Sequence, residues 1–586
     1  MLFRELARVY EEVESRSSRL EMTELLANFL RQVDCASIDK VVYLTQGQLY
    51  PDFYPNKLGL ADRLLMKTMV MATGMKEETI KTIWLKEGDP GKVAQQVFQS
   101  RKQMTLFSEP LTLERVYANL VSITEAEGAG SQELKMKLLS KLLSDATMEE
   151  AKFISRIVTG KMRLGVASMT LVDALALAFA SKEERDEVER AFNITSDLGK
   201  VAKVLCSQGI EAVRGIKVTV GSPLRSMLAE RMRSPREILE RLGGKAAFEY
   251  KYDGVRVQAH ITQEGIKLYS RRLEDLTSQF PDVSVSLRAS FRGSTAIVEG
   301  ECVPVDVNTG ELLPFQEVSH RRGRKHGLED AVEEYPVKVF LFDCVYLDGE
   351  DLSSRPFLER RRALESAFTK DERVAFSEMR ILSHEKEVDE FFQEALKDGC
   401  EGLMAKSIGP DSVYRAGARG FLWIKYKKEY RSEMTDTVDL VVVGAFAGRG
   451  KRAGLYGALL MATYNELEDV FETVCKLGSG FDDATLASLP ALLEPYKLGQ
   501  RHPRVRSRME ADHWFEPAVV LEVLGAEITV SPIHTAAMSK VRDGSGLAIR
   551  FPRFSGRVRT DKGPREATTS QELEEMYHKQ LKTIEG

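Results

Sequence analysis

The chain has 586 residues, of which 29% are charged and 43% hydrophobic, and its formal net charge is −5. This length predicts about three or four domains, each large enough for a core of its own. The acidic balance does not indicate nucleic-acid binding by the chain as a whole, so such binding must come from a local positive patch.

The cysteines and the apolar runs narrow the cellular setting. The six cysteines include no Cys-x-x-Cys pair, which argues against a zinc module or a disulfide framework and favours a reducing, intracellular environment. Acidic residues in the amphipathic N-terminus argue against a signal peptide. No apolar run approaches the roughly 18 residues of a membrane span, so no membrane association is expected.

Residues 1–212 are expected to form an all-α domain. Strand-like alternation is nearly absent, and apolar residues recur at helical spacing in 2–13, 23–33, 113–123, 134–143, 148–158 and 171–179. Between two of these helices lies Gly160-Lys161-Met-Arg163-Leu-Gly165, where two cations and nearby backbone amides could contact phosphate. On these residues alone, a plain turn between helices is an equal interpretation.

The stretch Phe248-Glu249-Tyr-Lys251-Tyr-Asp253-Gly254-Val-Arg256 opens the next region, in which strands and helices mix up to about residue 433. Lys251 ends a strand-like run, and an Asp-Gly turn leads to a second run over 255–261. A lysine that is half desolvated beside a second cation can have its pKa lowered, and its neutral amine is a nucleophile. An exposed lysine before a hairpin turn is the plainer alternative.

Charged residues lie on several of the later strands. Glu301, Asp343 and Glu401 are of the type that holds Mg²⁺ or a sugar hydroxyl beside phosphates. Lys425 and Lys427 share one face of a predicted strand and are suited to neutralise phosphate oxygens. Singly, each charge could face water at a strand edge, but together they indicate one cleft that handles phosphate.

From about residue 434 the chain is rich in strands, predicted at 438–446, 457–464, 470–474, 514–528 and 547–551. Short strands separated by turns suit a small barrel. The segment 550–562 adds a dense group of cations interleaved with aromatic residues, which could contact nucleic acid.

Taken in order, these motifs resemble those of the ATP-dependent DNA ligases of the archaeal and eukaryotic replicative type, within the covalent nucleotidyltransferases. The resemblance runs nearly end to end and is carried by Lys251-Tyr-Asp-Gly-Val-Arg256, Ser270-Arg271-Arg272, Val298-Glu-Gly-Glu301, Phe340-Leu-Phe342-Asp343, Glu401-Gly-Leu-Met-Ala-Lys406, Trp423-Ile-Lys425-Tyr-Lys427 and Arg557-Val-Arg559-Thr-Asp561-Lys562. Arg272 departs from the Asn of many relatives. The implied fold is a helical DNA-binding domain (1–212), an α+β adenylation domain (213–433) and a C-terminal OB-fold β-barrel (434–586).

The resemblance implies that the protein seals nicks in duplex DNA, joining a 5′-phosphate to a 3′-hydroxyl, in replication, repair and recombination. Lys251 would attack the α-phosphorus of ATP and carry AMP as a covalent lysyl adenylate. Glu249 would read the adenine edge, Phe342 would stack on the base, and Glu301 would take the ribose or a metal.

The remaining implied roles concern phosphate, metal and nucleic acid. Arg256 and Arg271 would contact the nick phosphate and border the nucleotide, and Lys425 and Lys427 would hold the α-phosphate. Further residues implied to bind ATP, or pyrophosphate when the barrel closes over the core, are Arg419, Arg557, Arg559 and Lys562. The residues implied for Mg²⁺ or Mn²⁺ are Glu301, Glu401 and Asp343.

The resemblance also implies partners. Lys161 and Arg163 would bind DNA, and the loop with Gln103, Leu106 and Phe107 is similar to the sliding-clamp-binding loop of archaeal ligases. The protein is expected to act as a monomer in the cytoplasm, with the chromosome.

Three alternatives compete with this interpretation. An RNA ligase or capping-type nucleotidyltransferase shares the catalytic core, but the helical first domain argues against both. An NAD⁺-dependent ligase would carry a cysteine zinc site, which the sequence lacks. A catalytically dead nucleic-acid clamp is disfavoured because Lys251 and the other motif residues are present.

Overall fold

The computed structural model describes residues 1–55, 58–100, 109–128, 130–305, 312–313, 315, 318, 321, 332, 335–427, 437–448, 454–525, 527–550 and 552–585. The chain divides into two compact units, Met1–Tyr426 and Lys427–Gly586. Among the described residues, a search for helices long and apolar enough to cross a membrane found none.

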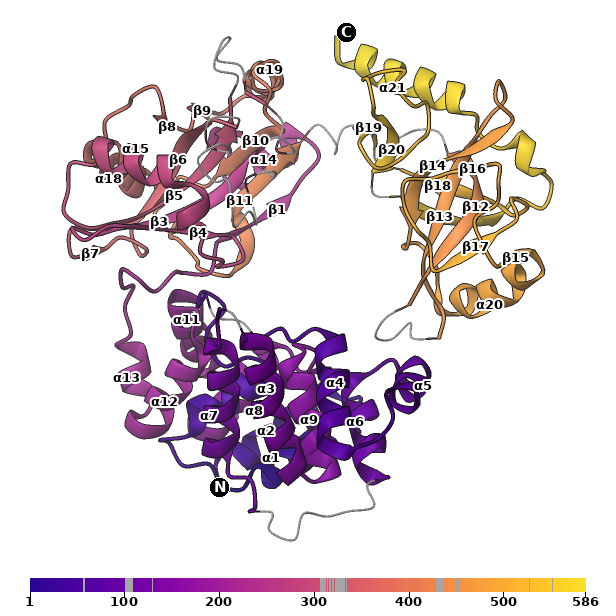
Figure 1. Cartoon of the computed structure of the whole chain (residues 1–586). Coiled ribbons are helices and arrows are strands. Elements are labelled where there is room, and N and C mark those ends of the chain that lie inside the picture. The colour runs from indigo at the N-terminus through magenta and orange to yellow at the C-terminus, as the bar shows by residue number, and fades with distance from the viewer. Residues whose placement is uncertain are drawn as a thin grey trace. The chain divides into compact units, whose positions relative to one another are not determined.

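The first unit begins with the predicted helical region, in which Figure 1 shows helices alone. Its helices are α1 (Phe3–Glu14), α2 (Arg19–Leu30), α3 (Ile38–Thr45), α4 (Asp62–Thr73), α5 (Glu77–Glu87), α6 (Pro90–Gln99), α7 (Leu113–Glu125), α8 (Ser131–Asp145), α9 (Met148–Val158), α10 (Ser168–Phe179), α11 (Arg185–Thr195), α12 (Leu198–Gln208) and α13 (Ile210–Arg214). The six predicted helices are confirmed with small shifts of their ends. The helices between and after them escaped the sequence pattern.

Local sequence explains where several of these helices start. Ser18, Asp89, Thr112 and Asp197 each accept a hydrogen bond from a backbone N–H in the first turn of the helix that follows. These side chains satisfy N–H groups that have no partner within the helix. Of these helices, α6 packs against α9, whose Phe153, Ile154 and Ile157 are fully buried.

One feature of this helical region corrects the sequence analysis. Cys35, which lies just before α3, and Cys206, on α12, form a disulfide across 171 residues of sequence. Their spacing gave no signal because the pairing depends on how the helices pack. Cys302, Cys344, Cys400 and Cys475 are free and buried.

The rest of the first unit contains two sheets (Figure 1). The first has the order β1 (Leu228–Arg231), β11 (Arg419–Lys427), β10 (Gly402–Lys406), β2 (Ala246–Lys251) and β9 (Met379–Leu382). The second has the order β4 (Ile266–Ser270), β3 (Val255–Ile261), β5 (Ala296–Pro304), β6 (Val337–Leu347) and β7 (Glu350–Asp351), with β8 (Val374–Phe376) beside β6.

Each sheet has its own helices and its own core. α14 (Pro235–Arg241) and α19 (Glu385–Lys397) share a core with the first sheet, and α15 (Pro281–Ser290) and α18 (Phe357–Ala367) share one with the second. A further cluster joins Trp423 of the first sheet to Ile297 and Val345 of the second. The two sheets therefore meet through apolar side chains, and the predicted α+β core is confirmed.

The second unit is rich in strands. Its elements are β12 (Val438–Ala447), β13 (Tyr456–Asn465), β14 (Val470–Leu477), α20 (Asp483–Leu493), β15 (Lys497–Leu498), β16 (Val505–Arg506), β17 (His513–Phe515), β18 (Val520–Leu524), β19 (Glu527–Ser531), β20 (Gly546–Arg550), β21 (Arg553–Val558) and α21 (Ser570–Glu585). The strand predicted at 514–528 is wrong as one element, because Pro517 and Gly525 interrupt it and it forms β17, β18 and β19.

The main sheet of this unit has the order β15-β17-β12-β13-β14-β16, with β18 pairing with both β12 and β21. Among the described residues these pairings do not close into a barrel, and β19 pairs only with β20. A sheet-rich C-terminal domain is therefore confirmed, while the OB-fold stays a prediction.

Candidate active site

Lys251 lies where the chain passes from the first sheet to the second. It is the last residue of β2, and after the turn at Tyr252, Asp253 and Gly254 the chain continues in β3. These two strands belong to different sheets, so the turn is not a hairpin. A Cβ atom on Gly254 would clash with the carbonyl oxygen of Cys302 on β5, which explains the need for glycine.

Three carboxylates surround Lys251. The pairing of Gly402 with Lys251 brings Glu401 beside the lysine, and the two side chains form an ion pair. Burial raises the pKa of Glu301 to about 7, opposed by Lys251 and Arg256 and assisted by Glu401 and Asp253. Burial likewise raises the pKa of Asp253. Lys251 was expected beside a cation, but its ion-pair partner is an anion, and three acids lie around this one amine.

Arg256, the cation expected beside Lys251, is committed elsewhere. Its guanidinium forms an ion pair with Glu299 at 2.8 Å and donates to the Met227 carbonyl at 3.0 Å. It also lies over the rings of Phe342 and Trp423, 5.4 and 5.5 Å from their centroids. Arg256 and Phe342, both predicted to border the nucleotide, are thus brought together.

Glu249 is held by two cations that the sequence analysis did not assign. Lys406 lies 2.6 Å from one of its carboxylate oxygens, and Arg361 on α18 donates to the other at 3.1 Å. All three side chains are almost completely buried. Burial lowers the pKa of Lys406, although Glu249 beside it acts in the opposite direction. The carboxylate is therefore fixed in one orientation, with acceptor capacity left on both oxygens.

Asp343 is placed differently from the metal ligand that was expected. Both of its oxygens accept hydrogen bonds from Arg360 of α18, at 2.8 and 2.9 Å, and both side chains are fully buried. This placement favours an internal ion pair over a metal ligand. The sequence shows three consecutive arginines, Arg360-Arg361-Arg362, but a run of charge does not indicate which acidic residue each arginine pairs with.

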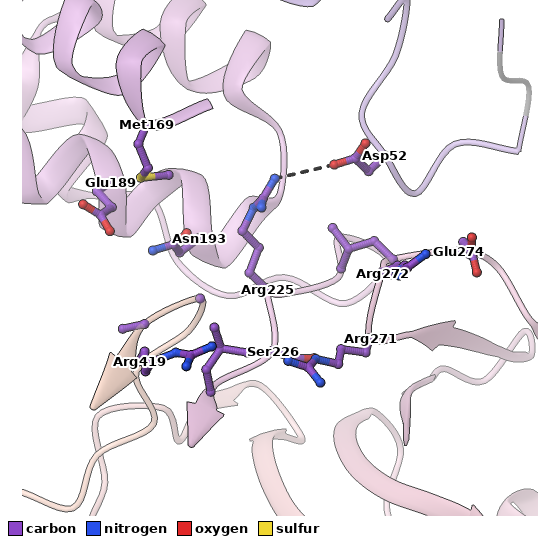
Figure 2. Close-up of a pocket in the computed structure, with 14 residues that line it drawn as sticks. Asp52, Met169, Glu189, Asn193, Arg225, Ser226, Arg271, Arg272, Glu274 and Arg419 are labelled. Carbon is purple, nitrogen blue, oxygen red and sulfur yellow. Dashed lines mark ion pairs between the residues drawn. The ribbon is translucent and has the colours of Figure 1, made fainter. Parts of the chain in front are cut away.

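The remaining predicted cations of the first unit lie in several places. Lys425 and Lys427 lie on β11, on the face that Trp423 shares by alternation. Arg271 and Arg419 line a cavity together with Arg225 and Arg272 (Figure 2). In the helical region, Lys161 and Asp62 form an ion pair at 2.7 Å, and Arg163 and Asp89 form one at 2.9 Å.

In the second unit, the two arginines of the last motif differ in exposure and in hydrogen bonding. Arg557 is exposed. Arg559 donates to both oxygens of Asp439, at 2.9 and 2.7 Å, and Lys562 donates to the same carboxylate at 2.7 Å. Asp439 was not anticipated from the sequence. Gln103, Leu106 and Phe107 fall outside the described residues.

Mg²⁺ or Mn²⁺ can be tested against these side chains. Among the described residues, no three His, Cys, Asp or Glu side chains are already spaced to hold a metal ion. Mg²⁺ keeps several waters and is usually bound through one or two carboxylates plus phosphates. The raised pKa values of Glu301 and Asp253 show a group of acids that a cation would relieve. Glu301 and Glu401 therefore fit such an ion.

Comparison with known proteins identifies the family. The family model described as "DNA ligase N terminus" matches residues 2–176, "ATP dependent DNA ligase domain" matches 226–427, and "ATP dependent DNA ligase C terminal region" matches 452–562. "DNA ligase 2" of Thermofilum pendens is 52% identical over 99% of this chain and 97% of its own length. "DNA ligase" of Staphylothermus marinus is 48% identical, with 100% of both chains covered.

A solved structure agrees in fold. "Pmar-Lig_PreS3" matches with a TM-score of 0.54 and 17% sequence identity, covering 94% of this chain and 99% of that chain. The relatives that match over the whole length and the three family models indicate the same family. The chain belongs to the ATP-dependent DNA ligases.

Proposed function

We propose that this protein uses ATP to seal nicks in duplex DNA, joining a 5′-phosphate to a 3′-hydroxyl, in replication, repair and recombination. The observation that carries the proposal is Lys251 at the junction of the two sheets, in ion-pair contact with Glu401. Whole-length relatives that are named DNA ligases support it.

In the first step the Lys251 amine bonds to the α-phosphorus of ATP while the bond from that phosphorus to pyrophosphate breaks. Glu401, in ion-pair contact with the amine, is placed to accept its proton. AMP then passes from the lysine to the 5′-phosphate at the nick, and the 3′-hydroxyl displaces it. Each step is a phosphoryl transfer, in which positioning and charge neutralisation supply most of the catalysis.

Base recognition falls to Glu249 and Phe342 in this proposal. A carboxylate held in place by Lys406 and Arg361 offers only acceptor oxygens, which suits the amino group of adenine and disfavours the oxo group of guanine. Phe342 offers a ring face for stacking, and Arg256 lies over the same ring. Glu301 would accept a ribose hydroxyl or share the metal.

Phosphate recognition is assigned to the cations. Lys425 and Lys427 would neutralise the α-phosphate, and Arg256 and Arg271 would contact the nick phosphate. Further nucleotide or pyrophosphate contacts are proposed for Arg419, Arg557, Arg559 and Lys562. A Mg²⁺ or Mn²⁺ ion held by Glu301 and Glu401 would supply additional positive charge at the phosphates. Asp343 is left out of this set because Arg360 occupies it.

Three domains are proposed for these tasks: 1–212 for DNA binding, 213–433 for adenylation and 434–586 as an OB-fold. Lys161 and Arg163 would exchange their present carboxylate partners for DNA phosphates. The protein is proposed to act as a monomer inside the cell.

The proposed mechanism predicts a covalent adenylate on Lys251. Wild-type protein incubated with α-labelled ATP and Mg²⁺ should retain label through denaturation, and Lys251→Ala should retain none. Lys245→Ala, which changes an exposed lysine just before β2, is the matched control and should label normally. Equal labelling of the Lys251 variant would rule the mechanism out.

A sliding clamp is the proposed protein partner, through Gln103, Leu106 and Phe107. Phe107→Ala should remove the stimulation of sealing by an added sliding clamp and leave sealing without a clamp unchanged. A full response to the clamp in this variant would exclude the loop as the contact.

A further inference from the structure

A cavity of about 780 Å³ opens within the first unit, and its lining includes Arg271 and Arg419, two of the residues proposed to contact nucleotide or nick phosphate. It is lined by residues of the helical region, of the first sheet and of the turn that follows β4, among them four arginines: Arg225, Arg271, Arg272 and Arg419. Figure 2 shows the guanidinium groups of Arg271 and Arg419 on either side of Ser226, both turned toward it, and Arg225 extending toward Asp52.

The positive charge of this cavity is poorly balanced. Within the described part of the chain, Arg271, Arg272 and Arg419 have no carboxylate within ion-pair distance. Glu189, one of the acids in the lining, is already paired with Arg185. Burial lowers the pKa of Arg271, and the nearby Arg256, Arg419 and Arg272 lower it further, against the opposite effect of Glu301. Crowding of like charges in this manner is relieved by a bound anion.

Arg225 is held by the backbone on both sides. Its N–H donates to the carbonyl of Asn193 on α11 at 2.8 Å, and its carbonyl accepts from the N–H of Gly417 at 2.9 Å. Gly417 has a φ of 69° and lies so near Asn193 that a Cβ atom would clash with that side chain. The position of Arg225 in the cavity is therefore built into the fold.

Among the described residues, the side chain of Arg225 has a single carboxylate within ion-pair distance. Its guanidinium lies 3.5 Å from a carboxylate oxygen of Asp52 and 4.2 Å from the ring centroid of Phe192. The Nε donor is buried and has no hydrogen-bond partner in the part of the chain that the structure describes. A guanidinium with an unused donor can bind an anion that lies closer than Asp52. Such an anion would displace Asp52.

We propose that this cavity binds a phosphate group of the nicked DNA strand, with Arg225 and Arg272 adding to Arg271 and Arg419, and that Asp52 competes with DNA for Arg225. The inference rests on the proposed sealing function and extends it by two residues, Arg225 and Arg272, to which no role is given above. Arginine suits the task because its fork of donors matches the oxygens of a phosphate. The triphosphate of ATP offers the same chemistry, so the test separates the two sources.

The first arm of the test uses Arg225→Gln and Arg272→Gln. Each should weaken binding of a nicked duplex roughly tenfold, because a charge-assisted hydrogen bond is lost. The slope of log affinity against log salt should flatten by about one for each variant, since one phosphate contact disappears. Lysyl-AMP formation from labelled ATP should stay within about twofold of wild type, and sealing of a pre-adenylated nick should fall with the affinity. Arg272→Lys should recover part of the loss.

Arg236→Gln is the matched control, because Arg236 is an exposed arginine of the same unit and pairs with Glu240. It should leave affinity, salt slope and sealing unchanged. Wild-type affinity and slope in both cavity variants would overturn the inference. A loss of lysyl-AMP formation equal to the loss of sealing would also overturn it, by assigning the cavity to ATP. A wild-type protein that forms no lysyl-AMP would instead refute the proposed function.

The second arm tests Asp52 and the source of the phosphate. Asp52→Asn should tighten DNA binding by about threefold, the scale of one exposed ion pair, whereas loss of a merely structural contact would weaken it. Weaker binding by this variant therefore counts against the competition. A nick with a 5′-hydroxyl in place of the 5′-phosphate identifies the group: if the effect of Arg272→Gln disappears on it, the cavity takes the terminal phosphate. If the effect persists, the cavity takes a phosphodiester of the strand. Either result supports the inference.

Discussion

Two groups of carboxylates in the adenylation core differ in how their charge is balanced. Glu249 and Asp343 have both oxygens occupied by cations, Lys406 and Arg361 for the first and Arg360 for the second. Asp253, Glu301 and Glu401 surround one ammonium group, Lys251, and the pKa values of Asp253 and Glu301 are raised.

The difference distinguishes carboxylates that hold the fold together from carboxylates placed to take part in the reaction. A buried charge with a complete set of partners has one favourable geometry, so it fixes the strands and helices that carry it. A group of acids with too little positive charge is unfavourable in the free protein and becomes favourable when cations arrive. We therefore expect changes in the first group to alter stability and base selection, and changes in the second to alter pH dependence.

Breaking the Asp343–Arg360 pair should have the largest effect. Asp343→Asn leaves a buried guanidinium without its counter-charge, and removing one partner of a buried pair destabilises by about 3–5 kcal/mol. Urea denaturation should show this loss. Replacing both residues together, as Asp343→Leu with Arg360→Met, should be less destabilising than Asp343→Asn alone. Equal or greater loss in the double variant would contradict the assignment.

Removing a cation that orients Glu249 should have the second-largest effect, and it should alter the KM for ATP rather than stability. Arg361→Met removes one of the two cations that orient the carboxylate, so the KM for ATP in lysyl-AMP formation should rise roughly tenfold, the loss of one charge-assisted hydrogen bond. Discrimination between ATP and GTP should fall as well. Arg361→Lys should restore part of both.

A matched control for that measurement lies one residue further along α18. Arg362→Met removes an exposed arginine and should change neither KM nor discrimination. If Arg361→Met lowered kcat alone, with KM and base selection unchanged, the positioning role would be refuted.

The carboxylates around Lys251 should make the stability of the protein depend on pH. The folded pKa of Glu301, at about 7, lies above the ordinary value of 4.5 for a glutamate, so the folded state prefers the neutral acid. Its contribution to stability is present below pH 4.5 and is lost as pH rises through about 7. Glu301→Gln, which stays neutral, should therefore be more stable than wild type at pH 8, by about 1–2 kcal/mol after allowing for partial exposure.

The same variant separates stability from activity. Melting temperatures measured between pH 4.5 and 8 should diverge as pH rises, with the variant the higher, while its rate of lysyl-AMP formation falls. Melting curves that stay parallel across this range would show that Glu301 is ionised normally.

The sequence predicts the strands of this site better than it predicts the partners. The predicted bounds of β3 at 255–261 match the structure, because apolar alternation is a local signal. The sequence also predicts Lys251 and Glu401 as site residues, but it does not predict the contact between them. The partners Arg361 and Glu249 lie 112 residues apart, and Cys35 and Cys206 lie 171 apart, so only the packed fold brings them together.

The last motif repeats the contrast within the second unit on a smaller scale. Arg559 is bound by Asp439 and Asp561, whereas Arg557 is exposed. Arg559→Gln should lower the melting temperature of the protein by a few degrees, because its hydrogen bonds to two carboxylates are lost, and Arg557→Gln should leave it unchanged. Replacing both should slow lysyl-AMP formation more than sealing of a pre-adenylated nick, since pyrophosphate leaves in the first step only. If sealing of the pre-adenylated nick were the more impaired step, these arginines would act on DNA instead of pyrophosphate.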